Sequence, residues 1–140
     1  MHTFVKSRRI NATLVATLVA FLCMAGVGGH VSAADPTQND FQRLEGRWVR
    51  PDGGYILELR SIKKDGGVSA AYFNPRSIKV YSAKVSRKEG NVILFVELRD
   101  VNYPGSTYSL QYDAATDRLK GTYYQAVQRQ NFDIEFVRVR

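Results

Sequence analysis

Short alternating segments recur through most of this chain, and they constrain its fold more than any other feature. From Gly46 onward, apolar or aromatic residues alternate with polar ones over short stretches, which Gly, Pro, Asn and Asp separate. A period of two is typical of half-buried β-strands, and these turn residues supply the backbone conformations that reversals need. The eight predicted strands are Gly46–Arg50, Tyr55–Ile62, Val68–Phe73, Ile78–Ser86, Val92–Arg99, Thr107–Asp113, Leu119–Val127 and Phe132–Val139.

The connections between these strands are too short to hold a helix of useful length. Neighbouring strands should therefore pair antiparallel, as a meander. Because an open sheet would leave two unprotected edges, we expect an all-β fold in which the eight strands close into a small barrel over residues 44–140. A barrel of this size is either filled by side chains or holds one small ligand.

One predicted strand and one predicted loop depart from the simple pattern. Val92–Arg99 is apolar on both faces, so we expect a loop, the N-terminal arm or a partner to cover its outer face. In the following loop, Asp100–Ser106, we expect a turn at Pro104-Gly105. Tyr103 in this loop either covers that apolar face or lies on the rim of the barrel, where it would contact a ligand or partner.

The first 33 residues have the pattern of a cleavable signal peptide. A basic start with Lys6, Arg8 and Arg9 precedes an apolar run that is too short for a comfortable membrane span, and Val31-Ser32-Ala33 is a suitable cleavage site. We expect the mature protein to begin at about Ala34 with a polar arm over residues 34–43, to lack a membrane span, and to be exported to the periplasm or secreted. Ser7-Arg8-Arg9 leaves a twin-arginine route open beside the general one.

The composition of the mature part excludes most catalytic chemistry. Every Cys, His and Met of the chain lies in the predicted leader, so thiolate and histidine mechanisms and the common zinc sites are absent after it. We therefore expect no enzyme, no metal and no cofactor. A carboxylate pair is the remaining catalytic possibility, and its candidates are Glu58, Glu97, Asp100 and Glu135.

The charge balance argues against a nucleic-acid partner. The predicted leader carries three of the 20 basic residues and none of the 13 acidic ones, which leaves a mildly basic domain. Cations do cluster in and around the fourth predicted strand, where lysine commonly protects a sheet edge against association. They are Arg76, Lys79, Lys84, Arg87 and Lys88.

The segment Leu44-Glu-Gly-Arg-Trp48, followed by Gly-bearing turns and a strand with Tyr72, resembles the start of calycin barrels, the lipocalins and above all the avidin-like proteins. The resemblance implies that Trp48 packs across the closed end as a structural anchor, with a ligand cup at the other end. Biotin is not expected, because avidin-like sites use several tryptophans and Trp48 is the only one here. Ala71–Arg76 and Val96–Ser106 also resemble a family of uncharacterised exported bacterial proteins, which implies no activity.

Two functions follow as expectations. The first is a non-enzymatic binding module that holds a small apolar or aromatic ligand in the barrel cup. Its candidate ligand-binding residues are Tyr55, Tyr72, Tyr103, Tyr108 and Tyr123, and Tyr112 shares their inward pattern. The alternative is an envelope interaction protein, such as a protease or lysozyme inhibitor that uses the N-terminal arm or the barrel rim. The tyrosines could also fill the barrel and leave no cavity.

Overall fold

The computed structural model describes residues 40–140, and these form an almost entirely β structure. The predicted leader, its cleavage site and the arm up to residue 39 lie outside the described residues. The strands are β1 (Gly46–Val49), β2 (Ile56–Arg60), β3 (Ser69–Asn74), β4 (Arg76–Ile78), β5 (Val80–Lys88), β6 (Asn91–Asp100), β7 (Tyr103–Asp113), β8 (Arg118–Gln125) and β9 (Gln130–Arg138).

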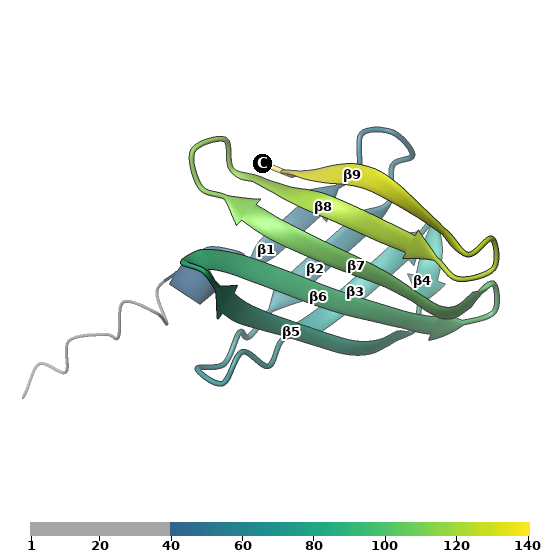
Figure 1. Ribbon diagram of the computed structural model, residues 1–140, viewed down its shortest axis with the longest axis horizontal. Helices are drawn as coiled ribbons and strands as arrows, with labels where there is room; N and C mark the ends of the chain where they lie inside the picture. Colours follow the sequence, from purple (N-terminus) through teal and green to yellow (C-terminus); the bar gives the residue numbers. More distant parts are fainter. Residues whose placement is uncertain (1–39) are drawn as a thin grey trace, which may run out of the picture. The chain divides into compact units, whose positions relative to one another are not determined.

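The strands form one antiparallel sheet that curls into a nearly closed barrel (Figure 1). The order is β4-β3-β2-β1-β9-β8-β7-β6-β5, so pairing of β1 with β9 joins the first strand to the last. The predicted antiparallel meander and its curling into a barrel are confirmed, with the barrel nearly closed. A seam remains between the two ends of this strand order. Across it, Gly67 forms a β-bridge with Lys84, and the Val85 N–H donates to the Gly66 carbonyl at 2.7 Å.

The barrel has nine strands rather than eight because the predicted strand Ile78–Ser86 is divided. Lys79 separates β4 from β5. Its N–H donates to the Asp100 carboxylate at 2.8 Å, and its carbonyl accepts the Arg99 N–H at 3.0 Å. Both contacts are long-range, and they turn the chain so that β4 pairs with β3 while β5 pairs with β6.

The predicted turn at Pro104-Gly105 is wrong. Asp100 pairs with Tyr103, so the reversal lies at Val101-Asn102, where Asn102 has a φ of 67°. Gly105, with a φ of 94°, falls at a register shift between β6 and β7 and is the extra residue of a bulge. Pro104 can stand in β7 because that part of the strand extends beyond the pairing with β8.

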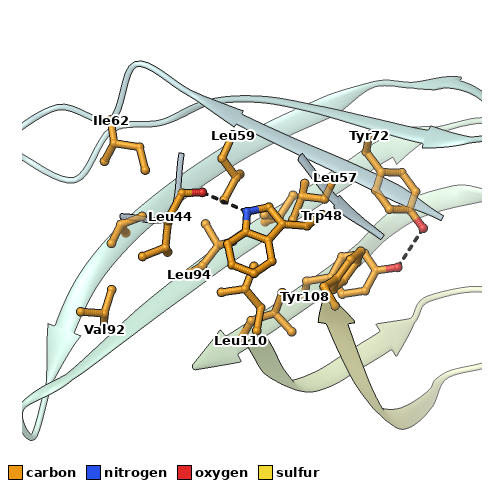
Figure 2. Packing of buried hydrophobic residues seen from close by; sticks show 14 of the residues in the cluster. Leu44, Trp48, Leu57, Leu59, Ile62, Tyr72, Val92, Leu94, Tyr108 and Leu110 are labelled. Atoms are coloured by element: carbon orange, nitrogen blue, oxygen red, sulfur yellow. Dashed lines mark hydrogen bonds between the residues drawn. The ribbon is translucent and has the colours of Figure 1, made fainter. Parts of the chain in front are cut away.

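Apolar side chains fill the barrel from one end to its middle. A helical turn over residues 40–42 lies against this end and contributes the buried Phe41, so the predicted boundary of the arm at residue 43 falls within the packed structure. Trp48 is fully buried, and its indole N–H donates to the Leu44 carbonyl at 2.9 Å (Figure 2). The Arg138 guanidinium lies 4.1 Å above the indole ring. These contacts close one end of the barrel.

The outer face of β6 does not have the expected cover within residues 40–140. Phe95 is 39% exposed there, and Tyr103 points to the other side of the sheet. Tyr81 on the neighbouring strand β5 is also exposed, beneath the guanidinium of Arg99. β5 ends the strand order and carries the cations Lys84, Arg87 and Lys88, of which Lys84 lies at the bridge to Gly67. Within the described residues, no helix is long and apolar enough to cross a membrane.

Candidate functional site

A cup of about 440 Å³ opens at the end of the barrel opposite the helical turn. This volume is in the range of small-molecule sites. The walls come from β3, β4, β7, β8 and β9, from the connection between β1 and β2, and from the hairpins between β6 and β7 and between β8 and β9. Its lining is aromatic and amide-rich, with Arg50, Tyr55, Tyr72, Asn74, Arg76, Ile78, Val101, Asn102, Tyr103, Tyr123, Gln125, Gln128 and Phe132.

Four of the five candidate tyrosines line this cup, namely Tyr55, Tyr72, Tyr103 and Tyr123. Tyr108 lies beneath them as the fully buried floor, and it stacks on Tyr123 with ring centroids 4.6 Å apart. Tyr103 accepts a hydrogen bond from Asn74 and meets Tyr72 edge to face, which places it at the rim. Tyr112 is elsewhere, because its ring packs against Trp48.

Arg50 is the most deeply buried charged residue of the cup, and the sequence pattern did not identify it as a site residue. It is only 7% exposed, and its guanidinium lies between the rings of Tyr55 and Tyr123, 4.6 and 5.6 Å from their centroids. Asp52 binds it from the solvent side through Nε at 3.0 Å and Nη2 at 2.5 Å. Nη1 donates to the Tyr108 hydroxyl at 3.1 Å. The cup therefore contains a buried, oriented cation.

A chain of hydrogen bonds leads from this cation into the cup. Arg50 donates to Tyr108, and the hydroxyls of Tyr108 and Tyr72 are 2.8 Å apart (Figure 2 shows the tyrosine pair). Burial raises the pKa of Tyr108 to about 12 and raises that of Tyr72 further still. Burial opposes the charge of Arg50, but the hydrogen bonds with Asp52 and Tyr108 outweigh it and raise the Arg50 pKa. At neutral pH the site thus holds a charged guanidinium and two protonated phenols.

Strand alternation was the signal that could have found the polar lining. Trp48 faces inward on β1, and Arg50 follows two residues later. In the same way Asn74 follows the buried Tyr72, and Gln125 follows the buried Tyr123. Because side chains on one face of a strand recur every two residues, each inward face continues into a polar residue at the mouth.

The candidate carboxylates are not assembled into a pair. Glu58, Glu97 and Glu135 lie on three different strands and each binds an arginine. Asp100 instead accepts hydrogen bonds from the N–H groups of Lys79 and Val101. In the part of the chain that the structure describes, no group of three or more Cys, His, Asp or Glu is placed to hold a metal ion.

A second hollow, of about 720 Å³, lies around the opposite end of the barrel. Charged residues from the helical turn and from three strands surround it, among them Arg43, Arg87, Asp113 and Lys120. Part of this charge is already paired, because Arg87 binds Asp40 and Lys120 binds Asp113. It has no aromatic wall comparable to that of the cup.

Searches of family models, of curated proteins and of solved structures found no match to this chain.

Proposed function

We propose that this protein is a non-enzymatic binding module that holds a small aromatic ligand in the cup. The observation that carries the proposal is the half-empty barrel: apolar side chains fill one end, whereas tyrosines surround about 440 Å³ of space at the other. Flat aromatic walls favour a planar ligand, since stacked and edge-to-face contacts add to the free energy of burial. The calycin resemblance and export to the periplasm or beyond fit this function and stay predictions.

Ligand entry can be blocked from the mouth. Gln125 lines the cup near the end of β8, so Gln125→Trp should fill the space and weaken binding of the neutral probe 2-naphthamide at least about tenfold. Gln111→Trp is the matched control, because Gln111 is exposed on the outer face of β7. Isothermal titration calorimetry on the full chain would measure both. Absence of binding to the parent protein, or equal binding to both variants, would refute the proposal.

A protein partner on the rim is a second candidate function. Val101 and Val127, at the tips of the two hairpins that flank the mouth, are 75% and 59% exposed. A lysozyme or protease inhibitor that used this rim would lose inhibition in a Val127→Asp variant, and 2-naphthamide binding would stay unchanged because Val127 does not line the cup. If the full chain inhibits neither class of enzyme, this candidate fails.

A further inference from the structure

We propose that the ligand of the cup carries a carboxylate, which binds to Arg50 and Tyr72. This inference rests on the proposed function and specifies the chemistry of its ligand. Among residues 40–140, the charged side chains that line the cup are those of Arg50 and Arg76, and neither Asp nor Glu lines it. An aromatic body with a single anionic group would match both the tyrosine walls and this charge.

Arg50 has donors left for such a group. A guanidinium carries five N–H groups. Asp52 accepts two and Tyr108 accepts one, so one N–H on Nη1 and one on Nη2 have no acceptor among residues 40–140. Burial of a charged donor without an acceptor is costly, and a ligand oxygen in the cup would remove that cost.

Tyr72 supplies a further donor. The Tyr72 and Tyr108 hydroxyls share one hydrogen bond, which uses one of their two protons and leaves the other free. Because the Tyr108 oxygen already accepts from a cation, its own O–H is polarised into a better donor, which favours donation from Tyr108 to Tyr72. The remaining proton then lies on Tyr72, the member of the pair that lines the cup.

The nearby acidic side chains do not cancel the preference of the cup for an anionic ligand. Asp52 neutralises Arg50 formally, but it lies outside the lining and its side chain is 58% exposed, so water screens its charge. Asp100 is turned toward two backbone N–H groups, and their hydrogen bonds lower its pKa. An anion in the cup therefore meets N–H and O–H donors and Arg76, and within the described part of the chain no carboxylate lines the walls.

The test compares two probes of nearly equal shape, 2-naphthoate and 2-naphthamide, by calorimetry on the full chain at neutral pH. We expect naphthoate to bind at least about tenfold more tightly, because hydrogen bonds to charged groups are the stronger ones. Arg50→Gln should reduce the ratio of the naphthoate affinity to the naphthamide affinity to near one. Arg47→Gln is the matched control on the strand that precedes Arg50, because Arg47 pairs with Glu58 on the outer face and should leave the ratio unchanged.

Two further measurements keep the proposal open to refutation if Arg50→Gln does not fold. Tyr72→Phe removes a donor without removing a charge and should lower the ratio about threefold or more. Gln125→Trp should abolish naphthoate binding, and persistence would place the anion elsewhere. The carboxylate proposal would be refuted if the parent protein bound both probes with equal affinity, or if Tyr72→Phe left the affinity ratio unchanged. Either result would leave the proposed binding function standing. Absence of binding by either probe would refute both.

Discussion

Trp48→Ala should destabilise the barrel by about 3–5 kcal/mol, as is typical when a fully buried aromatic side chain is truncated. The substitution would open a cavity between the closed end and the cup floor, and it would leave the buried Leu44 carbonyl without its donor. Arg138 would also lose the ring beneath it. We expect the urea midpoint to fall by more than about 1 M, since small domains lose about 1–3 kcal/mol per molar urea.

Two variants calibrate this result. Trp48→Phe keeps most of the aromatic bulk and should cost clearly less than Trp48→Ala, the difference reporting the additional volume lost. Tyr81→Ala removes an aromatic ring that is 55% exposed and should cost no more than about 1 kcal/mol through its contact with Arg99. A urea midpoint for Trp48→Ala close to that of the parent protein would show that Trp48 does not anchor the closed end.

Gly66→Ala should destabilise the protein by about 2–5 kcal/mol by forcing open the seam of the barrel. Gly66 has a φ of 84°, which costs an L-residue about 1–2 kcal/mol. A Cβ at this position would also lie 2.0 Å from the Val85 carbonyl oxygen, an overlap that the backbone must move to relieve. Thermal unfolding and faster exchange of the Val85 amide, whose N–H donates to Gly66, would report the opening.

Gly90→Ala separates the cost of the steric overlap at the seam from the cost of the backbone conformation. Gly90 has almost the same conformation, with a φ of 81°, but a Cβ there meets nothing within 4 Å. We expect this variant to lose only the conformational part, about 1–2 kcal/mol. If the two variants are equally stable, the approach of Gly66 to β5 does not contribute to closure.

Local alternation was sufficient to predict the strands, because burial of one face dictates a period of two. It could not predict the break at Lys79, since Ile78 and Val80 continue the alternation without interruption. That break depends on two hydrogen bonds, one that Lys79 donates to Asp100 and one that it accepts from Arg99, and only the folded chain brings these residues near. The turn at Val101-Asn102 was missed for a related reason: Pro104-Gly105 has the stronger turn chemistry, but the register of β6 with β7 converts Gly105 into a bulge.

The candidate site was predicted in its aromatic part and missed in its polar part. Tyrosines attract attention as inward-facing residues with a polar tip, and four of the five do line the cup. Arg50 was overlooked because an arginine before Pro51-Asp52 is typical of an exposed turn. Its burial depends on Tyr108, 58 positions away, and on the rings of Tyr55 and Tyr123, which sequence spacing alone does not bring together.

Mapping of the bound probe onto the barrel tests the central claim, that the open cup is the binding site. Backbone amide signals of the ¹⁵N-labelled full chain would be followed during titration with 2-naphthoate. We predict that the shifts concentrate at the mouth, around Arg50, Asn74, Asn102 and Gln125. Shifts concentrated instead around Arg43, Arg87 and Lys120, or over the exposed Tyr81 and Phe95, would contradict the account.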